Sequence, residues 1–314
     1  MPKNIHHIHD KFFKEVLADR AAAIDFFDHF LPGDLLDSLD LDSLERQAIS
    51  FTAPHLQEIF TDAIFGFKTK NGKGNLFVSI LLEHKSVKDK YAQFQILRYL
   101  AQGYEAQLKS KTPLRVIIPF IFYHGKETWR MKKLRDFFPE VPNNLTKYIP
   151  DYNSIFVDLK DHSVESIQGI LNVFLSTALI LQKYSRNSIE IKAHFERIMD
   201  SIGRLTNKNF LVTLVVYMTQ VLDIEEAEFR LRLDTLPAPL KANIMSTYNS
   251  IIEKGIEKGI AEGIEKGIEK GIEKEKIAVV LKAYANNLSL AIIANITNLT
   301  IEEVEDIVKR APVE

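Results

Sequence analysis

The chain contains no cysteine among its 314 residues. Disulfide bonds and thiolate metal ligands are therefore excluded. Long hydrophobic runs are missing too, because the most apolar stretches, residues 170–181 and 210–222, fall short of the roughly 18 residues that a membrane span needs. The N-terminal residues lack the apolar core and the cleavage site of a secretion signal. We therefore expect a cytoplasmic protein without membrane contact.

Neither sign of charge dominates, since the formal net charge is −2. No overall field would attract nucleic acid, so such binding would have to come from a local patch. One segment is strongly basic: residues 68–135 carry fifteen basic and four acidic side chains, a net charge of +11. This segment could bind phosphate groups, although a lysine-rich stretch can equally be ordinary solvated surface. A glycine-rich loop of the Walker type is missing as well, so nucleotide hydrolysis has no support.

The hydrophobic spacing alternates between helical and extended patterns along the first half of the chain. About the first forty residues have helical spacing, which Pro32-Gly33 interrupts. Residues 48–67 and 75–83 have the pattern of strands and are separated by a glycine-containing turn. Helical spacing returns over 89–109, and another apolar strand follows at 114–123. This order predicts an α/β fold, with a sheet covered by helices.

The second half of the chain is mainly helical in pattern. Pro237-Ala238-Pro239 marks a boundary, after which a Gly-Ile-Glu-Lys repeat places glycine and isoleucine at every fourth residue. We divide the chain into a domain at 1–240, a repeat helix at 241–276 and a small helical module at 277–314. The glycine and isoleucine stripe would let a partner helix approach closely, so we expect a homo-oligomer. The alternative is a flexible repeat without specific contacts.

The C-terminal module has the spacing of a helix-turn-helix. Its second helix, however, carries four carboxylates between Glu302 and Asp306. A helix that reads DNA rarely presents so many negative charges to phosphate. We therefore favour a packing or dimerisation module over a DNA-reading one.

Charged residues end the apolar strand at 75–83 and are the best candidates for chemistry. Glu83 and Lys85 are two residues apart, so they point to the same face of the strand, and His84 points to the other. A carboxylate binds a hard cation such as Mg²⁺, and a lysine stabilises charge on a phosphate. An isolated Glu-x-Lys is usually an ordinary strand end. Asp62 strengthens the case, because it lies on the preceding extended segment in an apolar setting that favours a cation or a hydrogen-bond network as its partner. The alternative is an aspartate at a strand edge or in a local cap.

Histidines offer weaker alternatives. His6, His7 and His9 could form a metal cluster, but near a chain terminus we expect His9 to cap or to pack instead. His124 follows a strand and could approach the site, although a structural histidine is the more common outcome.

Several motifs, in their order and spacing, resemble the Rpn family of recombination-promoting nucleases and transposase-like proteins. Three of them are His9-Asp10-Lys11-Phe12-Phe13-Lys14, Thr61-Asp62-Ala63-Ile64-Phe65 and Leu82-Glu83-His84-Lys85-Ser86. Gln95 with Tyr99, the run at 118–126, Trp129 and the repeat tail also fit. Each motif is weak alone, and their combination is fairly specific.

The resemblance implies a restriction-endonuclease-like core of the PD-(D/E)XK type, which is a mixed central sheet flanked by helices, here with a helical C-terminal extension. It implies cleavage of DNA with Mg²⁺ or Mn²⁺. Asp62 and Glu83 match the metal ligands, and Lys85 matches the catalytic lysine of the wider superfamily. Gln95 would support the site or touch DNA, and Asp10 would approach the metal through water. Thr61 stands where the family has proline, which the superfamily tolerates.

Two other functions stay open. The first is a DNA-binding or assembly protein on a nuclease fold that has lost catalysis. The second is a transposase that joins strands as well as cutting them, although the sequence shows no dispersed D-D-E triad that would support it.

Overall fold

The computed structural model describes residues 4–47, 63–70, 77–111, 113–185, 187–205, 207–221, 226–234 and 236–310. The chain forms two compact units, residues 1–247 and 248–314. In the described ranges, no helix has both the length and the apolar character needed to cross a membrane.

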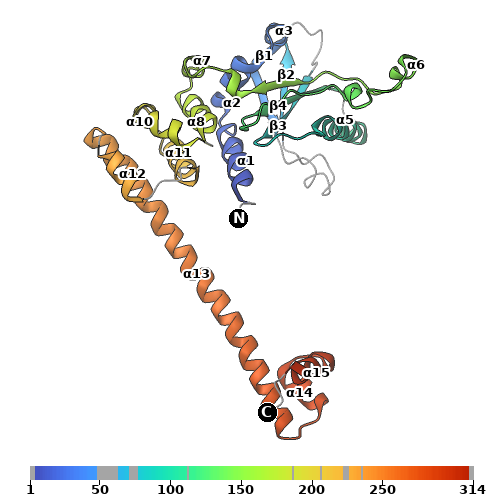
Figure 1. Ribbon diagram of the computed structural model, residues 1–314, viewed down its shortest axis with the longest axis vertical. Helices are drawn as coiled ribbons and strands as arrows, with labels where there is room; N and C mark the ends of the chain where they lie inside the picture. The colour runs from blue at the N-terminus through green and yellow to red at the C-terminus, as the bar shows by residue number, and fades with distance from the viewer. Residues whose placement is uncertain are drawn as a thin grey trace. The chain divides into compact units, whose positions relative to one another are not determined.

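The first unit is built on a sheet of five strands (Figure 1). The strands are β1 (Leu39–Gln47), β2 (Ala63–Thr69), β3 (Phe77–Lys85), β4 (Val116–Tyr123) and β5 (Ile155–Asp158). The helices that precede or interrupt them are α1 (Asn4–Val16), α2 (Arg20–Phe30), α3 (Gly33–Ser38), α5 (Ala92–Lys109), η1 (Leu134–Phe137) and α6 (Asn143–Thr146). After the sheet come η2 (Leu159–Asp161), α7 (Val164–Gln168), α8 (Val173–Tyr184), α9 (Ser188–Ala193), α10 (Phe195–Gly203), α11 (Lys208–Val221) and α12 (Glu226–Leu233).

The strands lie side by side in the order of the sequence, and the sheet is mixed. β1, β2 and β3 are antiparallel neighbours, whereas β3, β4 and β5 run parallel. Helix α5 makes the crossover that the parallel β3–β4 pair requires. The predicted α/β class and the predicted order of helix, strands, helix and strand are therefore confirmed. Most of the predicted strand at 48–67 lies outside the described residues, and the first strand is found earlier, at Leu39–Gln47.

One face of the sheet is packed with aromatic rings. Helices α1 and α2 cover this face, while α5 lies on the other (Figure 1). Phe26 of α2 has no exposed surface, and its ring contacts Phe13, Phe120 and Phe122 at centroid distances of 5.2–5.7 Å. The pairs with Phe13 and Phe122 are edge-to-face, an arrangement that adds a directional attraction to the hydrophobic burial. The aromatic layer therefore fixes the two N-terminal helices against the central strands.

The other face of the sheet packs against α5. Ile96 and Leu100 of α5 join Ile121 and Tyr123 of β4 in one buried cluster, which Trp129 completes. The alternation of β4 explains the division, since Phe120 and Phe122 point to the aromatic face and the residues between them to α5. Both faces of β4 are thus buried, as a central parallel strand requires.

Helix α8 is the buried centre of the helical second half. Nine consecutive residues, Phe174–Gln182, are buried, which is typical of a helix surrounded by protein. Asn172 caps its first turn by accepting a hydrogen bond from the Leu175 amide at 3.0 Å. Near its C-terminus, Lys183 Nζ donates to the carbonyls of Leu159, Lys160 and His162 at 2.8–3.1 Å. These bonds tie α8 to the segment that follows β5.

The predicted repeat helix lies within one long helix, α13 (Ala238–Ala285). It is followed by α14 (Leu290–Thr297) and α15 (Ile301–Arg310). Val280, Ile293 and Val304 form a small core among these three helices. A capping box begins α15, because the Thr300 hydroxyl accepts from the Glu303 amide at 3.1 Å and the Glu303 carboxylate accepts from the Thr300 amide at 2.8 Å.

The aromatic layer generates a stability prediction. Replacing Phe26 by alanine should lower the free energy of unfolding by about 3–5 kcal/mol, because the side chain is lost from a closely packed site. Leu171 is 90% exposed, so Leu171→Ala should change stability by no more than about 0.5 kcal/mol. Chemical denaturation of both variants measures the difference. Equal stabilities would contradict the assigned role of the aromatic layer.

Candidate active site

The strand β3 ends with Glu83, His84 and Lys85, and its pairing with β4 fixes where each side chain points. Glu83 lies opposite Ile121 and Lys85 opposite Tyr123. In a parallel ladder, paired residues share a face. Glu83 and Lys85 therefore project toward α5, as the strand alternation predicts, and His84 projects toward α1.

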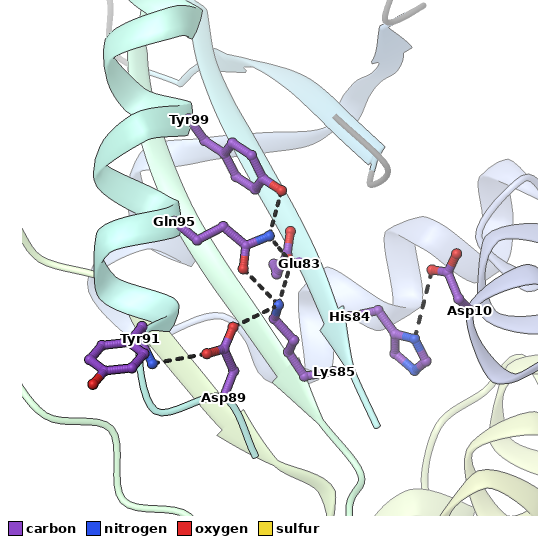
Figure 2. Close-up of polar contacts among 8 residues, drawn as sticks. All are labelled: Asp10, Glu83, His84, Lys85, Asp89, Tyr91, Gln95 and Tyr99. Carbon is purple, nitrogen blue, oxygen red and sulfur yellow. Dashed lines mark hydrogen bonds and ion pairs between the residues drawn. The ribbon is translucent and has the colours of Figure 1, made fainter. Parts of the chain in front are cut away.

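Glu83, Lys85 and Gln95 form one hydrogen-bonded cluster on the α5 face (Figure 2). Lys85 Nζ lies 2.9 Å from Glu83 Oε1. It also donates to Gln95 Oε1 at 2.8 Å, and Gln95 Nε2 donates to Glu83 Oε1 at 3.1 Å. The amide thus bridges the cation and the anion, a task that needs one donor and one acceptor on the same side chain.

Two further residues hold this cluster in place. Tyr99, one turn along α5 from Gln95, is hydrogen-bonded to Gln95 Nε2 through its hydroxyl. Asp89 precedes α5 and uses both of its oxygens: Oδ1 accepts from the Tyr91 amide at 2.9 Å, and Oδ2 lies 3.4 Å from Lys85 Nζ. The start of α5 and the end of β3 are therefore joined through one lysine.

The two charged side chains of the cluster are largely removed from water, since Glu83 and Lys85 are 5% and 15% exposed. Their charges balance, and the neighbouring Asp89, which is 34% exposed, adds one negative charge. The second oxygen of Glu83, Oε2, is buried and has no hydrogen-bond partner among the described residues. A buried charged oxygen without a donor is costly, so this position favours an added cation.

The available ligands fit a hard divalent ion only in part. Glu83 Oε2 is an oxygen of the type that Mg²⁺ prefers. In the described ranges, however, no group of three or more histidine, aspartate or glutamate side chains is arranged to hold a metal. Asp62, the other predicted ligand, lies outside the described residues, so its position relative to Glu83 stays a prediction.

Asp10 lies on the opposite side of β3 from the cluster (Figure 2). Its Oδ2 accepts from Lys14 at 2.7 Å, and its Oδ1 lies 4.0 Å from His84 Nδ1. Burial lowers the pKa of His84 well below its ordinary value, and the charges of His9, Lys14 and Lys85 lower this pKa further. His84 is therefore neutral near pH 7. The structure does not bring Asp10 together with Glu83, and its predicted metal role stays a prediction.

The histidines near α1 are packing residues. His9 is 1% exposed, and its Nδ1 is hydrogen-bonded to the Tyr217 hydroxyl at 2.7 Å. This confirms the expectation that His9 packs. His124 is also buried, with its ring stacked on His84 at a centroid distance of 4.7 Å. The side chains of His6 and His7 lie outside the described structure.

Of the predicted site residues, the structure brings Glu83, Lys85 and Gln95 together. It adds Asp89, which the sequence analysis did not select. An aspartate just before a helix is usually a cap or turn residue, and this one is bound to the Tyr91 amide. The only sequence signal for its contact with Lys85 is the spacing of four residues between them.

Comparison with known proteins supports a family assignment. Residues 7–211 match the family described as "Putative transposase, YhgA-like". The recombination-promoting nuclease RpnD of Escherichia coli O157:H7 is 33% identical over 134 residues, which is 41% of this chain and 51% of RpnD. RpnA of Escherichia coli K12 is 32% identical over 122 residues, which is 38% of this chain and 41% of RpnA. The match thus spans about half or less of the length of these two relatives.

A third relative carries a different description. The "Putative inactive recombination-promoting nuclease-like protein YjiP" of Escherichia coli K12 is 36% identical over 91 residues, which is 29% of this chain and 86% of YjiP. No solved structure gives a significant match. The family match covers more than half of the chain and includes most of α1, the sheet and the Glu83–Lys85–Gln95 cluster. The chain therefore belongs to the YhgA-like transposase family, which the resemblance to Rpn recombination-promoting nucleases had indicated.

Proposed function

We propose that this protein is a metal-dependent endonuclease that hydrolyses phosphodiester bonds in DNA. The observation that carries the proposal is the buried Glu83 carboxylate, which has one oxygen bound by Lys85 and Gln95 and the other without a partner among the described residues. The nuclease descriptions of RpnD and RpnA support it. The order of N-terminal helices, three antiparallel strands, a crossover helix and parallel strands is compatible with a restriction-endonuclease-like core.

Each residue of the cluster would have a different role in the reaction. A bound Mg²⁺ or Mn²⁺ would lower the pKa of a water molecule and neutralise charge on the phosphate. Glu83 would hold this ion through Oε2, together with Asp62. Lys85 would stabilise the negative charge that builds up as water attacks phosphorus and the bond to a sugar oxygen breaks. Gln95 would hold the carboxylate and the lysine at fixed positions relative to each other, because it is hydrogen-bonded to both.

The buried setting favours this arrangement over a purely structural ion pair. A buried ion pair usually contributes little to the stability of a fold, because the free-energy cost of desolvating two charges often exceeds their electrostatic attraction. Here the lysine is held by two carboxylates and an amide, while one carboxylate oxygen stays unused. A lysine with three partners beside a carboxylate oxygen with none is the arrangement expected of a site that binds a further cation.

Two rivals have specific support. The description of YjiP as inactive favours a DNA-binding protein without catalysis, but in this chain Glu83 and Lys85 are both present and in contact. The family description favours a transposase. Strand-transfer products in addition to nicked DNA would identify that activity.

Glu83→Gln is the sharpest test, because it keeps the shape of the side chain and removes the charge. We expect Mg²⁺-dependent nicking of supercoiled plasmid to fall by at least about 100-fold, as is typical when one preorganised charge is lost from an active site. Lys85→Ala should lower the rate by a similar factor. Affinity for DNA should stay largely unchanged, because contacts elsewhere with the phosphate backbone supply most of it.

Glu105→Gln is the matched control for this experiment. Glu105 lies on the same helix as Gln95, but its side chain is 60% exposed and pairs with Lys109. Nicking by this variant should equal that of the wild type, and circular dichroism should show that all three variants are folded. A folded Glu83→Gln variant with full activity would refute the assignment.

We also propose that α13 mediates self-association. The isoleucines at 256, 260, 264, 268 and 272 are each 51–58% exposed. A methyl group added to any of the five repeat glycines, from Gly255 to Gly271, would meet no described atom within 4 Å. Spaced by four residues, the stripe drifts about 40° around the helix with each repeat and favours a right-handed wrap of a second copy. Exposed apolar stripes of this length are typical of interaction surfaces.

The stripe can be tested without shortening the chain. Ile264→Gln with Ile268→Gln should lower the particle mass measured by multi-angle light scattering, because it removes apolar surface from the stripe. Glu265→Gln with Glu269→Gln changes neighbouring exposed residues off the stripe and should leave the mass unchanged. An identical mass for wild type and the isoleucine variant would rule out this surface.

A further inference from the structure

A pocket of about 300 Å³ opens beside the Glu83–Lys85–Gln95 cluster. Asp89 lines the pocket and also lies 3.4 Å from Lys85 Nζ, so this one residue connects the pocket to the cluster. The lining also includes Ala92 and Gln93 of α5, and Trp129 and Phe137 contribute aromatic rings. A volume near the lower end of the range for small-molecule sites, about 300–1,000 Å³, suits a single planar group better than a duplex.

The rim of this pocket is positively charged. Lys88, Lys90, Arg130 and Lys132 line it and are exposed. In the described part of the chain, none of these four cations forms an ion pair with a carboxylate. The one acidic residue in the lining, Asp89, is bound to Lys85. An unneutralised group of four cations complements a chain of phosphates.

Three aromatic rings gather beside the pocket. Phe137 lines it, whereas Tyr91 and Phe94, at the start of α5, adjoin the Phe137 ring and are 57% and 38% exposed. Phe137 lies 6.0 Å from the Tyr91 ring and 5.1 Å from the Phe94 ring, centroid to centroid. Lys90 Nζ is placed over the Tyr91 ring at 5.2 Å. Exposed rings that gather next to unpaired cations combine the two elements of single-strand binding, a stacking surface and a phosphate-binding surface.

We infer that this pocket binds an unpaired stretch of the DNA strand beside the site of cleavage, with a base stacked on Tyr91. In a duplex, each base has both faces covered by its neighbours and offers only its edges. An unpaired base exposes a face that a ring can stack on. The preferred substrate would then be single-stranded, frayed or bubble-containing DNA. This substrate assignment rests on the proposed nuclease function.

Equilibrium binding in EDTA tests the pocket separately from cleavage. The ligands are a fluorescein-labelled 20-nucleotide oligo-dT and a 20-base-pair duplex at one fixed salt concentration, since salt changes all such affinities. We expect the wild type to bind the single strand more tightly. Tyr91→Ala should weaken binding of the single strand by at least about fivefold, because one stacking contact is lost. Binding of the duplex should stay the same.

Two matched variants make the result specific. Tyr91→Phe keeps the ring and should bind like the wild type. Tyr148→Ala removes another exposed tyrosine, also with a lysine at 5.2 Å from its ring. Tyr148 is not part of the group of rings around Phe137, so this variant should have no effect. Trp129 is the single tryptophan of the chain, so oligo-dT should also change the intrinsic tryptophan fluorescence.

The outcomes separate the two proposals. If Tyr91→Ala weakens both ligands equally, or if neither ligand binds, the pocket does not take an unpaired base. If single-strand binding depends on Tyr91 but plasmid is never nicked with any divalent ion, the pocket assignment holds and the nuclease proposal fails. If nicking is robust and Tyr91→Ala leaves single-strand affinity unchanged, the nuclease proposal holds and the pocket assignment is wrong.

Discussion

The negative charge of a carboxylate that is almost out of contact with water must be balanced by neighbouring groups. In the first unit, Glu83 imposes this requirement on the end of β3 and on α5. Its compensation comes from Lys85 on the same strand and Gln95 on the crossover helix. The lysine in turn holds Asp89 at the start of that helix. The position of α5 on the sheet is therefore coupled to the charge state of one strand end, because moving the helix would leave the carboxylate without its amide donor.

The alternation of β3 separates this polar face from an aromatic and histidine-rich face. His84 stacks on Phe13 of α1 at a centroid distance of 4.4 Å and on His124 at 4.7 Å. Its lowered pKa keeps it neutral, so no second positive charge is buried behind Lys85. The segment around His9 and Asp10 therefore packs against the face of β3 that carries His84, opposite the face that carries Glu83. This packing can influence the site by holding the end of the strand in place.

Strand alternation alone predicted that Glu83 and Lys85 share a face, and this required no knowledge of the fold. Gln95 was predicted only through the family resemblance, because its bridging position depends on how α5 crosses the sheet. Strand β1 was missed because its register shifts between Asp40 and Glu45, which breaks the alternation of apolar and polar residues. The four-residue strand β5 was missed because it is too short to show a period. Its pairing with β4 is decided by tertiary packing.

If Glu83 Oε2 is a ligand for a divalent cation, the protein should bind Mn²⁺ in the absence of DNA. Calorimetric titration of Mn²⁺ into the purified protein measures this binding. We expect saturable binding to the wild type that weakens at least about tenfold, the equivalent of about 1.4 kcal/mol, in Glu83→Gln. Binding should also raise the unfolding temperature of the wild type, because the ion stabilises the folded state. Equal Mn²⁺ affinity in the two proteins would show that Glu83 is not a metal ligand.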